Sequence, residues 1–124
     1  MQRSYEVVFY QTPRGDVPVD EFLDALDKKV RAKALKWLTL LGEEGPNLPM
    51  PYADVVEGPI RELRIGFGHL ELRFLYFFYR KKIVVTRGFL KKSRAIDPAE
   101  VQRALRAYAN WIKRQGGIRH EEEI

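Results

Sequence analysis

Basic side chains stand along and just after the strand-like segments in the second half of this 124-residue sequence. Arg64 and Arg73 lie within two such segments, and Lys91 and Lys92 follow the next one. Guanidinium and ammonium groups stabilise the negative charge that develops on a phosphate under attack, and arginine can do so through two parallel hydrogen bonds. If the segments are neighbouring strands, this grouping indicates a catalytic site for phosphodiester chemistry.

The two arginines also have an ordinary structural explanation. Glu62 precedes Arg64 by two residues and Glu71 precedes Arg73 by two residues, so each acid shares a strand face with its arginine. Ion pairs across a solvated sheet face would account for all four side chains. The sequence leaves both interpretations open.

Three further residues extend the candidate site as RNA contacts. Arg87 and Arg94 flank the lysine pair, and Phe77 is the aromatic residue of the long strand that we expect to be exposed for stacking on bases. His69 falls in a predicted turn and His120 lies near the end of the chain, so the two histidines form neither a metal site nor a catalytic triad. Since the chain has no cysteine, we expect no disulfide and no cysteine-ligated metal. We also expect no cofactor.

Hydrophobic periodicity predicts the elements that would position these residues. Strand patterns cover residues 5–10, 60–65, 70–79 and 83–89, and helical patterns cover residues 19–26 and 30–41. The charged segment at residues 27–29 either separates two helices or bends one. A last helix begins with Asp97 as its N-cap and Pro98 at its first position, and the glycine pair at Gly116 should end it.

These elements predict one α+β domain over residues 1–115 and a polar tail over residues 116–124. We expect a small antiparallel four-stranded sheet, with an N-terminal helix pair and a C-terminal helix packed on one face. Alternation along the strand at residues 70–79 directs Phe74, Tyr76 and Phe78 toward the helices. The opposite face would then stay open and carry Arg64 and Arg73.

The charge balance favours a polyanionic partner. Lys and Arg total 22 against 17 Asp and Glu, which gives a net charge of +5. The cations dominate between Arg61 and Arg114, so we expect a basic surface on one part of the fold that suits nucleic acid. A soluble basic surface without a dedicated ligand is the alternative. With no apolar run near the length of a membrane span and no signal peptide, we expect a soluble, cytoplasmic protein.

Several motifs together resemble the HigB-like branch of the RelE/ParE toxin superfamily. They are "GPIRELRI", "LELRFLYFF" and "IVVTRGFLKKSRAIDPAEVQRAL", with "DVPVDEFLDAL" resembling the first helix of that branch. The similarity runs from Tyr5 to about Lys113, and "GFLKK" at its distance from "ELR" is the most specific part.

The resemblance implies a toxin of a type II toxin–antitoxin pair that cleaves mRNA on the ribosome. The message's own 2′-hydroxyl would attack the adjacent phosphate, and no metal would be required. Arg64, Arg73, Lys91 and Lys92 match the basic active-site positions of the family, with Arg94 a looser match. The implied partner is a cognate antitoxin, often a helix-turn-helix protein in this branch, and no membrane is involved.

The sequence departs from the family pattern at two places. Arg87 stands where the family commonly has a histidine before "GF", and the tyrosine or histidine that serves as an acid or base near the C-terminus has no clear counterpart. A lysine crowded by cationic neighbours is one candidate base. The alternative function is that of a ParE-like inhibitor that blocks a target such as DNA gyrase and cleaves nothing.

Overall fold

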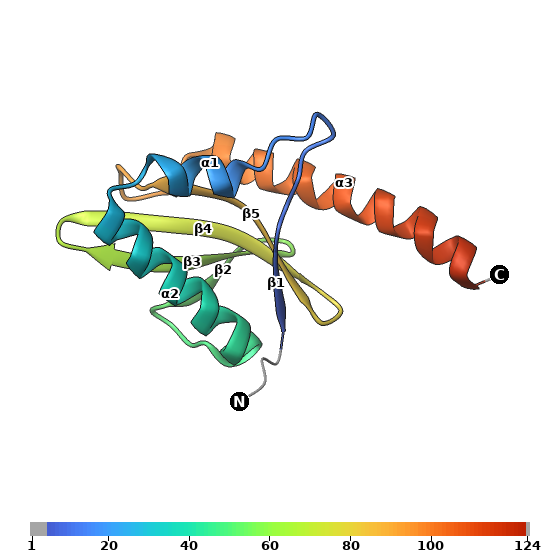
Figure 1. Ribbon diagram of the computed structural model, residues 1–124, viewed down its shortest axis with the longest axis horizontal. Helices are drawn as coiled ribbons and strands as arrows, with labels where there is room; N and C mark the ends of the chain where they lie inside the picture. The colour runs from blue at the N-terminus through green and yellow to red at the C-terminus, as the bar shows by residue number, and fades with distance from the viewer. Residues whose placement is uncertain (1–4, 124) are drawn as a thin grey trace.

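The computed structural model describes residues 5–123, and its side chains over residues 5–115 (Figure 1). The elements in chain order are β1 Glu6–Phe9, α1 Pro18–Ala25, α2 Lys28–Glu44, the short 3₁₀ turn η1 Gly45–Asn47, β2 Ala53–Glu57, β3 Ile60–Phe67, β4 Leu70–Tyr79, β5 Lys82–Leu90 and α3 Pro98–Glu123. Over the described range, no helix has the length and apolar character that crossing a membrane requires.

The sheet has five strands in the order β1-β5-β4-β3-β2, so the predicted four-stranded sheet is wrong by one strand. The meander from β2 to β5 is antiparallel, and β1 joins β5 in parallel. The missed strand, β2, is a five-residue edge strand with two acidic residues, and it follows the proline-rich segment at residues 49–51. The sequence analysis assigned no element to these residues, and pairing with β3 makes them a strand.

The helices cover both faces of the sheet, which corrects the prediction that they share one face. Buried residues of α1 and α2 form one core with the β4 side chains Leu72, Phe74 and Tyr76. A second core, on the opposite face, joins residues of α3 to Leu75 and Phe77 of β4. In Figure 1, α2 and α3 lie apart from one another. The reason is that both faces of β4 are apolar at this end, and the apolar stripe of α3 needs a surface to bury it.

The structure corrects two other predictions, one for the face that α3 covers and one for the end of α3. Phe77 is fully buried, with its ring edge-to-face against Tyr108 and Trp111, so the predicted exposed base-stacking role is wrong. The helix continues to Glu123, past its predicted end at Gly116. Glycine costs a helix only about 1 kcal/mol relative to alanine, which weakens the helix without forbidding it.

The predicted start of α3 at Asp97 is confirmed by its cap, and a second cap decides between the two alternatives for residues 27–29. The Asp27 carboxylate accepts a hydrogen bond from the backbone N–H of Lys29 and separates α1 from α2, so the charged segment divides two helices. The Asp97 carboxylate accepts one from the backbone N–H of Ala99 at 2.9 Å and begins α3. The position of α3 is therefore set at its first residue.

Gly88 allows close packing between β5 and α1. A Cβ atom at this position would collide with the ring of Phe22 and would lie 2.7 Å from Cε1 of Phe74. The two rings pack edge-to-face with their centroids 5.6 Å apart. The glycine of the "GFLKK" motif therefore has a structural role, since it lets β5 approach the aromatic core.

We expect Gly88→Ala to lower the free energy of unfolding by about 1–3 kcal/mol, because the new methyl group overpacks this contact. Gly66→Ala is the matched control: Gly66 lies in β3, and its nearest neighbour would be 3.9 Å from an added Cβ. Urea unfolding followed by circular dichroism measures both variants. Equal stability of the two would contradict the close contact with Phe22 and Phe74.

Candidate active site

Arg64 and Arg73 are cross-strand neighbours, as predicted, in directly opposed positions of β3 and β4. The carboxylate of Glu62 lies between them. Its Oε2 accepts a hydrogen bond from Nη2 of Arg64 at 3.0 Å, and its Oε1 lies 3.2 Å from Nε of Arg73. The second contact is ionic only, because neither atom has an aligned hydrogen bond. One acid thus joins the two predicted catalytic arginines.

Each arginine has a second acidic partner. Arg64 contacts Asp54 of β2 at 3.4 Å, and Arg73 contacts Glu71 of β4 at 3.2 Å. The ion pairs that the structural interpretation predicted within each strand are therefore present, and Asp54 adds one from the strand that the sequence did not predict. A pattern search could not find Asp54, because its proximity to Arg64 depends on the pairing of β2 with β3.

The two arginines differ in their access to solvent. Arg73 is 6% exposed, and its Nη1 also donates a hydrogen bond to the backbone carbonyl of Leu72 at 2.9 Å. The side chain of Arg64 is 32% exposed. Arg64 is therefore accessible to a ligand, whereas Arg73 is buried and contacts Glu62.

Arg64 lines a cleft of about 440 Å³ between the β2–β3 edge of the sheet and the start of α3. Lys91 and Arg94 line the same cleft from the loop that joins β5 to α3. The loop is tied to the sheet where it begins, since the backbone N–H of Lys91 donates to the carbonyl of Glu71 at 2.8 Å. The remaining lining residues are Val55, Val56, Glu57, Glu62, Ile96, Pro98, Val101 and Gln102.

The loop cations give the cleft its unbalanced positive charge. Among the side chains of residues 5–115, no carboxylate lies within ion-pairing distance of Lys91 or Arg94. The N-terminal end of α3 adds partial positive charge at Pro98. An anionic group in the cleft would therefore meet two unpaired cations and the exposed part of Arg64.

The other predicted residues lie outside this cleft. Lys92 lines a neighbouring pocket of about 520 Å³, which Lys91 also lines from the other side of the loop. Arg87 donates a hydrogen bond from Nε to Glu100 and lines a third pocket. With Phe77 buried, the cleft brings together Arg64, Lys91 and Arg94.

The groups that line the cleft limit how protons can move. Its lining contains no histidine or tyrosine, so its proton acceptors are the carboxylates of Glu57 and Glu62. Tyr76 lies on the opposite face of the sheet, where burial raises the pKa of its phenol and Arg61 partly opposes that shift. Within the described part of the chain, no three His, Asp or Glu side chains are grouped to hold a metal ion.

The chain is similar to a known protein family and to solved structures. The family model described as "Phage derived protein Gp49-like" matches residues 21–109, which include every ionisable residue of the cleft. A solved structure, the archaeal RelE–RelB complex from Pyrococcus horikoshii OT3, contains a chain that is 19% identical with a TM-score of 0.48. The match covers 74% of this chain and 99% of that one. No curated protein sequence matches with significant similarity.

We expect Arg73→Leu to lower the free energy of unfolding by about 3–5 kcal/mol, because it leaves Glu62 as a buried, unpaired carboxylate on that side. The double variant Glu62→Leu/Arg73→Leu should recover most of the loss, since it removes both charges. Arg64→Leu is the control, with an expected loss of about 1 kcal/mol or less for a partly exposed ion pair. Chemical denaturation that finds Arg73→Leu as stable as Arg64→Leu would contradict a structural role for Arg73.

Proposed function

The chain belongs to the family of phage-derived Gp49-like proteins, and from this premise we propose that it is the toxin of a type II toxin–antitoxin pair, an endoribonuclease that cleaves mRNA on the ribosome. The observation that carries the proposal is the cleft in which Arg64, Lys91 and Arg94 meet. The motifs that resemble HigB-like toxins, "ELR" and "GFLKK", supply Arg64 and Lys91.

The proposed reaction is transesterification within the message. The 2′-hydroxyl oxygen forms a bond to the adjacent phosphorus atom, and the bond to the 5′-oxygen of the next nucleotide breaks with its electron pair. The 2′-hydroxyl loses a proton and the leaving oxygen gains one, which gives a 2′,3′-cyclic phosphate and a 5′-hydroxyl. Arg64, Lys91 and Arg94 stabilise the charge that builds up on the non-bridging oxygens.

Within this proposal the predicted basic residues take different roles. Arg64 binds phosphate, and its guanidinium is oriented by Asp54 and Glu62. Arg73 is a positioning residue, because it is buried and acts through Glu62. Lys92 faces the neighbouring pocket and attracts the strand toward the loop. Lys91, the lysine that lines the cleft, acts as a cation, so no lysine serves as the base in this proposal.

The composition of the cleft supports dependence on the ribosome. General acid–base catalysis by a well-placed side chain contributes about 10²–10⁴-fold to a rate. Since the cleft lining has no histidine or tyrosine for this purpose, positioning of the message must supply more of the rate enhancement. A ribosome holds its mRNA in a fixed path, and orientation of a reacting group is itself a large catalytic factor.

The proposed partner is an antitoxin, of the helix-turn-helix type that the family resemblance implies, which neutralises the basic surface. Such a complex should weaken as salt concentration rises if charge pairs dominate the interface. Coexpression of the product of the neighbouring gene tests this partner, since it should restore growth in cells that express the toxin.

One observation favours a second candidate, the ParE-like inhibitor of a target such as DNA gyrase. Asp54, Glu62 and Glu71 already pair with the two strand arginines, and no histidine or tyrosine lines the cleft. A surface that only blocks a target needs neither free strand arginines nor an acid–base pair. This function would leave messages intact and induce a DNA-damage response.

We expect induced expression to arrest growth and to leave translated messages cut within codons. Lys91→Gln/Arg94→Gln should lower message cleavage at least about 100-fold, because it removes charge stabilisation at the phosphate. The matched control, Lys29→Gln/Lys36→Gln, removes the same charge from exposed positions on α2 and should cut like the wild type. Sequencing of message 5′ ends measures cleavage.

Two results separate the candidates. Growth arrest with every message intact and with induced DNA-damage genes would replace the nuclease proposal by the inhibitor. Equal message cleavage by the two double variants, at equal protein levels, would show that the cleft takes no part in cleavage.

A further inference from the structure

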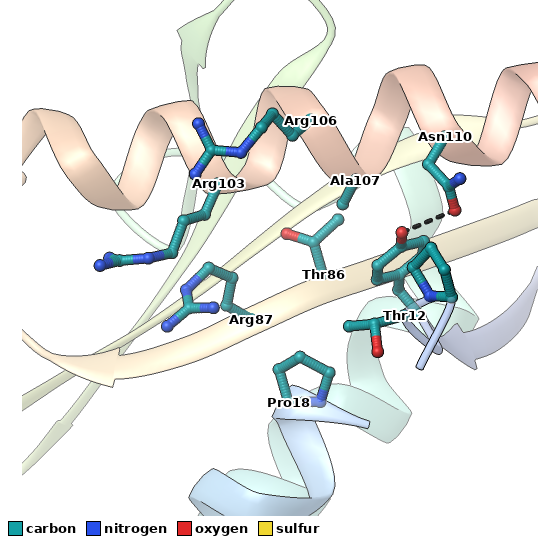
Figure 2. Close-up of a pocket in the computed structure, with 10 residues that line it drawn as sticks. Thr12, Pro18, Thr86, Arg87, Arg103, Arg106, Ala107 and Asn110 are labelled. Carbon is teal, nitrogen blue, oxygen red and sulfur yellow. Dashed lines mark hydrogen bonds between the residues drawn. The ribbon is translucent and has the colours of Figure 1, made fainter. Parts of the chain in front are cut away.

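A second basic pocket lies on the other flank of α3 (Figure 2). It has a volume of about 340 Å³ and is bounded by α3, β5 and the segment that joins β1 to α1. We call it the arginine pocket, because Arg87, Arg103 and Arg106 line it. Figure 2 shows Arg103 and Arg106 on the helix, with Thr86 and Arg87 on the strand below them. The cleft and the arginine pocket share no lining residue.

Local geometry brings the three arginines together. The pairing of β4 with β5 shifts register between Leu75 and Tyr76, where Thr86 is the extra residue of a β-bulge. The hydroxyl of Thr86 donates to the carbonyl of Leu75 at 3.1 Å and fills the gap in the ladder. Such a bulge redirects the side chains that follow it. Arg103 and Arg106 are three residues apart, so they lie on the same side of α3.

The far end of the pocket is held by hydrogen bonds between distant segments. Asn110 of α3 accepts from the hydroxyl of Tyr10 at 2.7 Å and from Arg114 at 2.6 Å. Arg114 also donates to the carbonyl of Gln11 at 2.7 Å. These bonds fix α3 to the segment after β1, so the pocket has a defined width before any ligand binds.

The charge of the pocket is positive. Glu100 is the acid beside it, and it contacts Nε of Arg87 and Nη1 of Arg103, the latter at 3.5 Å. Among the side chains of residues 5–115, no carboxylate pairs with Arg106. One carboxylate therefore faces three guanidinium groups, which leaves a place for a second anion.

The rest of the lining is suited to a nucleotide. Pro13, Pro18 and Ala107 add apolar surface to the lining of the pocket. A ligand that combines a phosphate with a flat ring and a sugar matches both parts, and the volume falls in the range of small-ligand pockets. An acidic protein segment would use the arginines but leave the apolar surface without a specific partner.

The pocket is also placed for a strand that leaves the cleft. Lys91 of the cleft and Arg87 of the arginine pocket are four residues apart along the β5 direction, which is about 13 Å. Between them lies the pocket that Lys91, Lys92 and Glu100 line. Two lysines, Lys91 and Lys92, thus lie between the cleft and the arginine pocket, together with the carboxylates Asp97 and Glu100.

We propose that the arginine pocket binds the phosphate of a second nucleotide of the same RNA strand, beyond the start of α3 from the cleft. This inference rests on the proposed function and adds to it a second contact with the RNA strand. Arg106 is its central phosphate ligand, because it alone of the three arginines has no carboxylate partner within residues 5–115. Arg87 and Arg103 share Glu100 and reinforce the positive charge.

Fluorescence anisotropy with a labelled 12-nucleotide single-stranded RNA tests the proposal. We expect Arg106→Gln to weaken binding about tenfold, the value of one charge-assisted hydrogen bond. The slope of log affinity against log salt should fall by about 0.7, the value for one phosphate contact on a single strand. Lys113→Gln, an equal loss of charge at an exposed α3 position outside the pocket, should change neither quantity.

Three further measurements make the test specific. Arg106→Lys should recover much of the affinity, because it keeps the charge. A trinucleotide is too short to contact the cleft and the pocket at once, so Arg106→Gln should weaken its binding less than it weakens binding of the 12-nucleotide RNA. Thermal melting should give the same midpoint for Arg106→Gln and Lys113→Gln, which excludes loss of folding as the cause.

The results separate this inference from the function on which it rests. If the wild type binds RNA and cuts messages while Arg106→Gln matches Lys113→Gln, the pocket assignment is wrong and the nuclease proposal stands. If the wild type neither binds the RNA nor cuts messages in induced cells, both are wrong. If Arg106→Gln weakens binding of a dodecaglutamate peptide but not of RNA, the pocket accepts an acidic protein segment and the assignment to RNA is overturned.

Discussion

The carboxylate of Glu62 holds together the two arginines on which the candidate active site depends. It lies almost fully buried, 3.0 Å from Arg64 and 3.2 Å from Arg73. Removing charges from water is costly, and the cost is repaid only when each charge keeps its partners. Arg73 can therefore leave Glu62 only at high energetic cost, and Glu62 in turn fixes the guanidinium of Arg64 at the floor of the cleft. The ion pairs of Glu62 thus link β3 to β4 and also orient Arg64, the arginine that faces the cleft.

Helix α3 divides the remaining face of the sheet into two basic regions. Its apolar side packs over Leu75 and Phe77 and excludes solvent from the centre of the face. Polar residues on its two flanks then meet different partners: Gln102 lies beside Arg64 and Lys91, and Arg106 lies beside Arg87. A helix that covered less of β4 would leave a single broad basic surface. Burial of an apolar stripe therefore separates the proposed cleavage site from the proposed second nucleotide site.

Local patterns in the sequence predicted the elements better than their assembly. The bounds of β4 agree with its alternating pattern, and the pairing of Arg64 with Arg73 follows from the two short connections around β4. Alternation also placed Phe77 correctly on the face opposite Phe74, yet exposure depends on what covers that face. The helix residues that contact Phe77 are Tyr108 and Trp111, which lie 31 and 34 residues later in the chain. The alternating pattern of a strand does not show which helix will cover each of its faces.

The candidate site was predictable in its cations and in the acids that share a strand with them, but not in Asp54. The spacing of Arg64, Lys91 and Arg94 and the family resemblance singled out the basic residues, because their motifs are continuous in sequence. Asp54 was not found, since it belongs to an edge strand that its own residues do not predict. The carboxylates nevertheless decide which cations are free to act. Of the predicted cations, Arg73 is buried in an ion pair, whereas Lys91 lines the cleft without one among the described side chains.

The loop that presents Lys91 and Arg94 owes its shape to residues at its two ends. Gly88 lets β5 pack against Phe22 and Phe74 just before the loop, and Asp97 caps α3 just after it. With both ends fixed, the number of residues between them determines which side chains face the cleft. An insertion or deletion there would move the cations while leaving the sheet and the helix intact. The motif is therefore constrained in length as well as in charge, which explains why its glycine and aspartate stand at the borders of its basic residues.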